Sequence, residues 1–377
     1  MLRLVIITAL LHSYIASRLI PDLLPLSALA AAVLAVWLAA STVLIPYSFQ
    51  MRRSTRDGLA QALAWTGLLA MGFFSSLFVL TIIRDVALLA GFTLSRFILV
   101  EAQLQQFREW SAAAVPLLAG LFTAVGYINA RRRAEVRSID IPIAGLPEPL
   151  HGFTIAQISD IHLGPTIRGH HLDAIVEAVN ELGADMIAVT GDLVDGTVAQ
   201  LAPHTEPLSR LSARHGAFFV TGNHEYYSGV HAWVAEIRRL GLCVLMNEHV
   251  VLQHEGAQLV VAGVTDFSAG RFDPSHASDP AAAVAGAPDA VSVLLAHQPR
   301  SALAAHSAGY DLQLSGHTHG GQFLPWNFFV RFQQPFTAGL HRIGKLWVYV
   351  SRGTGYWGPP KRLGAPSEIT RLRLVPA

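Results

Sequence analysis

Uncharged apolar stretches dominate the first 130 residues. Three of them contain no Asp, Glu, Lys or Arg, and each has the ~20 residues needed to cross a bilayer: residues 23–51, 58–83 and 111–130. A shorter apolar run, residues 4–17, lies between Arg3 and Arg18 and is either a short span with snorkelling arginines or a signal-like segment. Because no small-residue cleavage site followed by polar sequence is present, we favour a span. The pattern predicts an all-α membrane domain of about four helices over residues 1–130, with the apolar run 86–95 too short to cross and therefore interfacial.

Beyond residue 130 the pattern changes to short apolar runs alternating with segments of helical periodicity. Residues 167–182 and 230–240 have the spacing of amphipathic helices. Residues 267–290, rich in Ala, Asp and Pro, are expected to form a loop insertion. The alternation predicts an α/β domain over residues 153–377, preceded by a basic linker and a first strand over residues 131–152.

Five of the apolar runs end in side chains able to bind metal ions. Open α/β sheets place their chemistry at such strand ends. Taken singly, each is more often a polar turn or a structural histidine. Taken in order, they indicate one site assembled from five strand ends: Asp160 and His162; Asp192; Asn223, His224 and Glu225; His297; and His317 and His319.

These donors are oxygens and imidazoles, without a thiolate. Such a set suits Mn, Fe, Zn or Ni. The seven residues taken as ligands exceed what one tetrahedral ion takes, whereas two divalent ions about 3.5–4 Å apart account for the number: Asp160, His162, Asp192, Asn223, His297, His317 and His319. A carboxylate must then bridge the ions, and Asp192 is the natural choice.

The ordered motifs Asp160-x-His162, Gly191-Asp192, Gly222-Asn223-His224-Glu225, His297 and Gly316-His317-x-His319 resemble those of the calcineurin-like metallophosphoesterases. The resemblance implies a two-sheet β-sandwich flanked by helices, with hydrolysis by a hydroxide bridging the two metals. It implies that His224 is a non-ligand histidine that protonates the leaving oxygen or stabilises the transition state, and that Glu225 orients it. The implied ligands are Asp160, His162, Asp192 and His319 for one metal, and Asp192, Asn223, His297 and His317 for the other.

Two further segments, Gly320-Gly321-Gln322 and the loop 353–360, resemble the membrane-associated branch of this family. Some members of that branch are linked to cleaving a nucleotide-lipid pyrophosphate in lipid A synthesis. We therefore expect a phosphorylated, lipid-linked substrate, such as a UDP-diacylglucosamine-like pyrophosphate. Hydrolysis of a soluble cyclic nucleotide or a phosphoprotein, and a non-catalytic metal-binding membrane scaffold, are the alternatives.

Charge indicates the topology of the membrane domain. Arginines follow the second and fourth predicted spans, so the positive-inside rule places both clusters, and with them the α/β domain, in the cytoplasm of an inner-membrane protein: Arg52, Arg53 and Arg56; and Arg131, Arg132, Arg133 and Arg137. The net charge of +1, without an aromatic-basic pattern, gives no indication of nucleic-acid binding.

Several other residues carry weaker signals. Cys243, the single cysteine, lies in an apolar run and is expected to be a small core residue. The loop 353–360 is expected to border the active site, with neighbouring basic residues holding a phosphate: Arg352, Lys361 and Arg362. Tyrosines and histidines near the motifs either contact substrate or lie on ordinary packed or solvated faces, and solvation is favoured for the histidines: Tyr226, Tyr227, His170, His171 and His231.

Overall fold

The computed structural model describes residues 2–51, 58–95 and 101–377. It divides into two compact units. The helical unit comprises residues 1–129 together with residues 358–363, and the sheet unit comprises residues 130–357 and 364–377. The chain therefore passes between the units at three positions.

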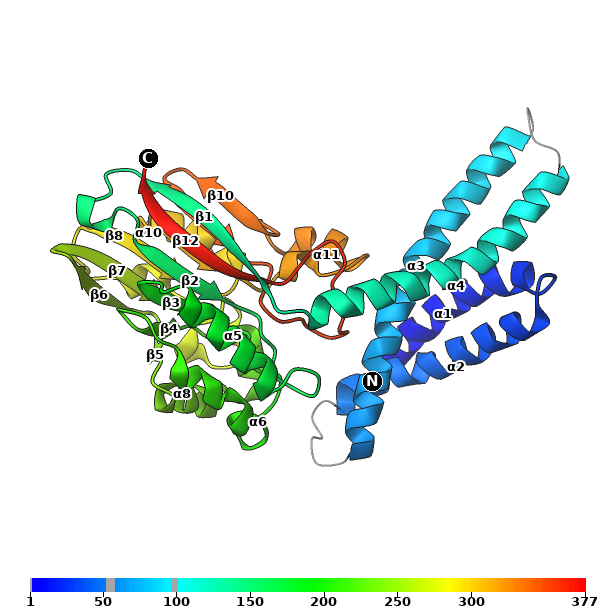
Figure 1. Cartoon of the computed structure of the whole chain (residues 1–377), viewed down its shortest axis with the longest axis horizontal. Helices are drawn as coiled ribbons and strands as arrows, with labels where there is room; N and C mark the ends of the chain where they lie inside the picture. The colour runs from blue at the N-terminus through cyan, green and yellow to red at the C-terminus, as the bar shows by residue number, and fades with distance from the viewer. Residues whose placement is uncertain (1, 52–57, 96–100) are drawn as a thin grey trace. The chain divides into compact units, whose positions relative to one another are not determined.

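Four long helices begin in the first part of the chain (Figure 1). Each is long and apolar enough to cross a membrane. Residues 86–95 continue the third helix without a break, so the separate interfacial segment expected there is wrong. The helices are α1 (Leu2–Leu23), α2 (Ala28–Met51), α3 (Gly58–Ser95) and α4 (Glu101–Arg131).

An ion-pair network connects three of these helices. Arg84 of α3 is buried and pairs with Asp22 of α1, which also accepts a hydrogen bond from Arg108 of α4 at 3.0 Å. Asp85 pairs with Arg18 at 2.9 Å. Charged groups inside a membrane unit are costly unless paired, and pairing accounts for their presence in otherwise apolar helices.

The sheet unit contains two six-stranded sheets. The first has the order β1-β12-β2-β3-β4-β5, and the second has the order β10-β11-β9-β8-β7-β6. The strands are β1 (Glu135–Ile143), β2 (Thr154–Ile158), β3 (Met186–Val189), β4 (Ala217–Phe219), β5 (Cys243–Val244), β6 (Glu248–His254), β7 (Ala257–Gly263), β8 (Val291–Leu295), β9 (Leu312–Ser315), β10 (Gly339–Ile343), β11 (Leu346–Val350) and β12 (Glu368–Pro376).

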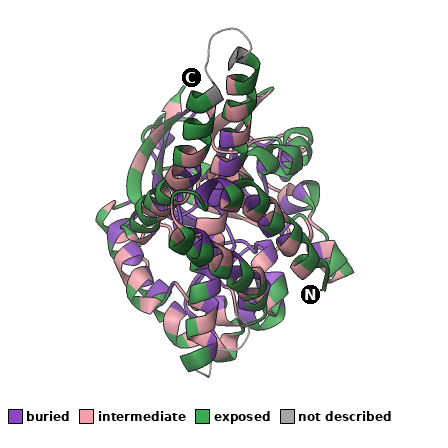
Figure 2. Ribbon diagram, turned by 90° about the vertical axis from the view of Figure 1, so that its right-hand side faces the viewer, coloured by how far each residue is buried: buried purple, intermediate pink, exposed green. Residues whose placement is uncertain are grey.

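Helices cover the outer faces of both sheets. Ile155 and Met186 of the first sheet pack against Val261 and Leu295 of the second. Because side chains alternate along a strand, the other faces of the same strands meet helices. The first sheet packs against α5, α6 and α8, and the second against α9 and α10. Figure 2 colours each residue by its burial, with buried residues in purple.

The structure has the expected sandwich of two sheets flanked by helices. The helices of this unit are α5 (Gly169–Glu181), α6 (Val198–Thr205), α7 (Asn223–Ser228), α8 (Val230–Arg239), α9 (Pro280–Val284), α10 (Ala302–Ala308) and α11 (Trp326–Gln333). Short 3₁₀ turns are η1 (Glu148–Leu150), η2 (Glu206–Arg210), η3 (Ala269–Arg271), η4 (Pro274–His276), η5 (Pro299–Ser301) and η6 (His319–Gly321).

Cys243 is exposed, so the expectation of a core cysteine is wrong. It lies on β5, the short edge strand of the first sheet. Successive side chains of a strand face opposite sides, and here Val244 takes the buried side. An apolar run does not reveal which of its residues faces outward.

Candidate metal centre

Five strands end at the same site. In the first sheet β2, β3 and β4 are parallel neighbours, and in the second β8 and β9 are parallel neighbours. Parallel strands bring their carboxyl ends to one edge, so the loops that follow them meet there. These loops carry the candidate ligands Asp160, His162, Asp192, Asn223, His297, His317 and His319.

The backbone is strained at these loops. Of the eight non-glycine residues with positive φ in the described parts of the chain, five are candidate ligands: Asp160, His162, Asp192, His317 and His319. Left-handed conformations cost about 1 kcal/mol or more and concentrate at functional sites. Asp160 and His162 therefore approach each other through left-handed turns after β2.

The first group of donors comprises Asp160, His162 and His319. The Nε2 atoms of His162 and His319 lie 3.0 Å apart, and Nε2 of His319 lies 3.4 Å from Oδ1 of Asp160. Donors of a tetrahedral ion at about 2.1 Å lie about 3.4 Å from one another. The spacing fits a shared ion.

The second group comprises Asp192, His297 and His317. Oδ2 of Asp192 lies 3.1 Å from Nε2 of His297, which lies 3.2 Å from Nδ1 of His317. Nδ1–H of His297 donates to the Thr190 carbonyl at 2.7 Å, and this bond turns Nε2 toward Asp192. Oδ1 of Asn223 is buried without a hydrogen-bond partner, as expected of an oxygen reserved for a ligand.

Asp192 joins the two groups. Its Oδ2 also lies 3.9 Å from Nε2 of His162 in the first group. Gly222 allows this close packing, because a Cβ at that position would lie 2.2 Å from Oδ1 of Asp192. The site thus has two sets of donors and a shared carboxylate, which fits a pair of divalent ions.

His224 lies beside the two groups with its ring held by Asp195. Its Nδ1 hydrogen-bonds Oδ1 of Asp195, and its Nε2 lies 3.9 Å from Oδ2 of Asp192. The other oxygen of Asp195 lies 3.4 Å from Nδ1 of His162. Asp195 therefore orients the imidazole of His224 and lies close to that of His162, a role that its position three residues after Asp192 did not reveal.

Glu225 does not orient His224, and that expectation is wrong. Its carboxylate accepts backbone N–H groups at 2.7 Å from Gly222, 3.0 Å from Asp192, 2.8 Å from Leu193 and 3.3 Å from Val194. These bonds hold the loop after β3 against the start of α7. Glu225 thereby positions the backbone that carries Asp192.

Comparisons with known proteins identify the family. The Calcineurin-like phosphoesterase family matches residues 153–321. The "Uncharacterized metallophosphoesterase YkuE" of Bacillus subtilis is 30% identical to this chain over 275 residues. The match covers 68% of this chain and 93% of YkuE. The chain belongs to the calcineurin-like metallophosphoesterases. A metallophosphoesterase of Aquifex aeolicus is 34% identical over 220 residues, covering 57% of this chain and 82% of that protein.

Membrane-associated relatives are also found. A "Transmembrane protein with metallophosphoesterase domain" of Danio rerio is 39% identical over 274 residues, covering 69% of this chain. The chain spans 63% of that relative, less than two thirds of its length.

Burial and neighbouring charges together shift the pKa values of this metallophosphoesterase centre. Burial lowers the pKa of His317 to about 3, with His297 acting in the same direction, so His317 is a neutral imidazole, the form that binds metal. Burial raises the pKa of Glu225 to about 7, and the charge of Asp192 adds to this effect. The pKa of His297 is raised well above its usual value, because the attraction of Asp192 outweighs burial.

A pocket of about 200 Å³ opens onto the metallophosphoesterase centre. Tyr227 and Trp357 line it, so the loop 353–360 borders the site as expected. Gln322 fixes Trp357 by donating to its carbonyl at 2.9 Å and accepting from its N–H at 2.9 Å. Other lining residues are His162, Asp192, Asn223, His224, His317, Thr318, His319, Trp326, Val330, Gln333 and Gln334.

None of the basic residues beside this loop lines the pocket, so the expected phosphate contact of Arg352, Lys361 and Arg362 stays a prediction. In the helical unit, Nζ of Lys361 donates to the Gly72 carbonyl at 2.6 Å and to hydroxyls of Ser75 and Ser76. Arg352 pairs with Glu368 at 3.1 Å. Arg362 is buried.

Proposed function

We propose that this protein is a membrane-anchored hydrolase of phosphoester or pyrophosphate bonds. The observation that carries the proposal is the shared carboxylate of Asp192 between two donor groups, with a further histidine beside them. Two divalent ions bound there supply charge stabilisation and an activated water. Asp160, His162, Asp192 and His319 would hold one ion, and Asp192, Asn223, His297 and His317 the other.

His224 is the proton donor in this proposal. Asp195 accepts Nδ1–H, which fixes the tautomer and stabilises the imidazolium, so Nε2 carries the proton toward the pocket. Tyr227 and Trp357 flank this ring at centroid distances of 5.2 and 6.3 Å. They shape the space for the leaving group.

A non-catalytic metal-binding scaffold is the alternative of another class. The pairing of His224 with Asp195 favours the enzyme, because a scaffold has no use for an oriented acid next to its metals. Hydrolysis of a generic aryl phosphodiester in Mn²⁺ separates the two, since a scaffold gives no turnover.

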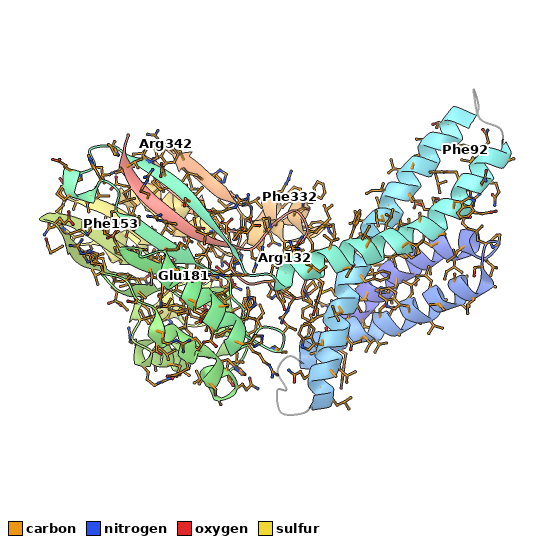
Figure 3. The ribbon with its side chains drawn as sticks, viewed as in Figure 1. Phe92, Arg132, Phe153, Glu181, Phe332 and Arg342 are labelled. Atoms are coloured by element: carbon orange, nitrogen blue, oxygen red, sulfur yellow. The ribbon has the colours of Figure 1, made fainter. Side chains whose placement is uncertain are left out.

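We propose a lipid-linked substrate, for example an acylated nucleotide-sugar pyrophosphate. Helix α11 supports this choice, because Trp326 and Val330 line the pocket while aromatic side chains of the same helix are exposed: Phe328, Phe329 and Phe332. Figure 3 labels Phe332, which is 80% exposed. Exposed aromatic clusters of this kind mark contacts with lipid or protein.

Two features favour lipid over protein as the partner of these exposed aromatic side chains. Residues 312–367, which include α11, contain no acidic residue, and three of their basic residues are exposed, a balance suited to anionic headgroups: Arg331, Arg342 and Lys345. Trp357 in the pocket wall is followed directly by Gly358 of the helical unit. A tether to membrane helices raises the effective concentration of lipid substrates and leaves that of soluble nucleotides unchanged.

We predict that the full-length protein has a higher kcat/KM for an acylated pyrophosphate in micelles than for its deacylated counterpart. Phe332→Ser should reduce this preference about tenfold, because burying one aromatic side chain is worth ~1.5–3 kcal/mol when complete. Leu303→Ser is the control, since Leu303 on α10 is 69% exposed and lies away from the pocket. Equal values for the two substrates in the unaltered protein would refute the lipid hypothesis and favour a soluble substrate.

We also propose that the sheet unit lies in the cytoplasm. The second arginine cluster, at the end of α4 and the start of β1, supports this orientation, whereas Arg52, Arg53 and Arg56 lie outside the described residues. A reporter active only in the cytoplasm should work when fused after Ala377, and a periplasm-dependent reporter should work within residues 97–106. The reverse pattern would place catalysis on the other side of the membrane.

A further inference from the structure

A second cluster of metal-binding side chains lies outside the catalytic centre. His231 stands at the start of α8, and Asp273 and His276 belong to the insertion expected at residues 267–290. One donor atom from each lies within 4.8 Å of the others. The catalytic proposal uses none of these residues.

The two histidine nitrogens of this cluster lie near one oxygen of Asp273. Oδ2 of Asp273 lies 3.3 Å from Nε2 of His231 and 3.9 Å from Nε2 of His276. Ligands at 2.0–2.2 Å around a tetrahedral ion stand about 3.3–3.6 Å from one another, and the two distances to Asp273 lie within or about 0.3 Å beyond this range. Simple ion pairing needs only one histidine, whereas here the Nε2 atoms of two histidines lie within 4 Å of the same oxygen.

The supporting contacts hold the donors in place. Oδ1 of Asp273 accepts from the backbone N–H and the hydroxyl of Ser275 at 3.0 and 2.6 Å, which leaves Oδ2 toward the histidines. Nδ1 of His276 hydrogen-bonds the hydroxyl of Tyr226 at 3.1 Å. Bonds of this type to the remote ring nitrogen or oxygen are characteristic of metal ligands.

We propose that His231, Asp273 and His276 bind a third divalent transition-metal ion. Two neutral imidazoles and a carboxylate suit Zn²⁺, with water completing the coordination on the exposed side. The site is distinct from the catalytic pair in residues and in role.

The ion would fasten the insertion to the wall of the substrate pocket. Phe272, next to Asp273, contacts the rings of Tyr226 and Tyr227 at centroid distances of 5.7 and 5.6 Å. Tyr227 lines the catalytic pocket. Fixing residues 272–276 to α8 thereby fixes a side of the pocket, and the ion is structural rather than catalytic.

The test counts Zn²⁺ bound by purified full-length protein after stripping and dialysis against buffered Zn²⁺. Wild type should bind one equivalent more than His231→Ala, His276→Ala or Asp273→Asn. His170→Ala is the matched control, because it removes another exposed histidine of the same unit, on α5, and it should bind as much as wild type. Equal binding by wild type and the three cluster variants would overturn the proposal.

A second measurement keeps this result independent of the catalytic centre. Asp192→Asn, which weakens the catalytic pair, should retain the equivalent that His231→Ala removes. Adding His231→Ala to Asp192→Asn should lower bound Zn²⁺ by one equivalent. No decrease would show that the third site does not exist, whatever the fate of the catalytic metals.

Discussion

Asp192→Asn is expected to abolish turnover and to remove most of the bound metal. The amide keeps the shape of the side chain but loses the charge that faces both donor groups, at 3.1 Å from Nε2 of His297 and 3.9 Å from Nε2 of His162. Removing this one charge therefore weakens the binding of both metal ions. The measurement is metal content of the purified variant alongside its rate on an aryl phosphodiester.

Asp173→Asn is the control for this variant. It makes the same chemical change in an ion pair with Arg210 on the surface, where an exposed pair contributes about 0–1 kcal/mol. It should retain metal and activity. Two full equivalents in Asp192→Asn would contradict the bridging role of this carboxylate.

His224→Gln is expected to retain both metals and to lose on the order of 10² to 10⁴ in kcat, the usual contribution of a general acid. His224 also forms a possible donor set with His162 and Asp192. Metal analysis distinguishes the roles, since loss of metal from His224→Gln would make this residue a ligand.

Asp195→Asn extends the same test to the residue that orients His224. Its carboxylate hydrogen-bonds Nδ1 of His224, so the variant should lose about 10- to 100-fold in kcat, the range for an outer partner of a site histidine. The rate of the double variant with His224→Gln should match that of His224→Gln within a few fold. A fully additive loss would show that Asp195 acts through another residue.

Apolar runs and their terminal polar residues are local patterns, so they were sufficient to predict an α/β domain in which five strand ends meet. The two-sheet sandwich was predicted from the family resemblance. Roles that depend on orientation were not predictable. Glu225 follows His224 directly, yet its carboxylate faces the backbone of Asp192. Asp195 lies in the same stretch as Asp192, but only the fold brings it to His224.

Contacts between residues far apart in the sequence explain the other differences between the predictions and the structure. Arg84 lies inside α3, and its partner Asp22 is 62 residues away on α1. Lys361 follows the pocket loop, but its ammonium binds carbonyl and hydroxyl groups of α3. Neither partner is visible from neighbouring sequence, so the sequence suggested a phosphate contact for Lys361 and no partner for Arg84.

The most direct measurement for the proposed dinuclear hydrolase is a titration of metal-free, full-length protein with Mn²⁺, following bound metal and aryl phosphodiester hydrolysis together. The proposed third site complicates counting, so the titration uses His231→Ala, which is expected to retain the catalytic pair. We predict that turnover rises to its maximum as the second equivalent binds and that Asp192→Asn remains inactive throughout. Full activity with one bound equivalent, or no turnover with two, would contradict the account.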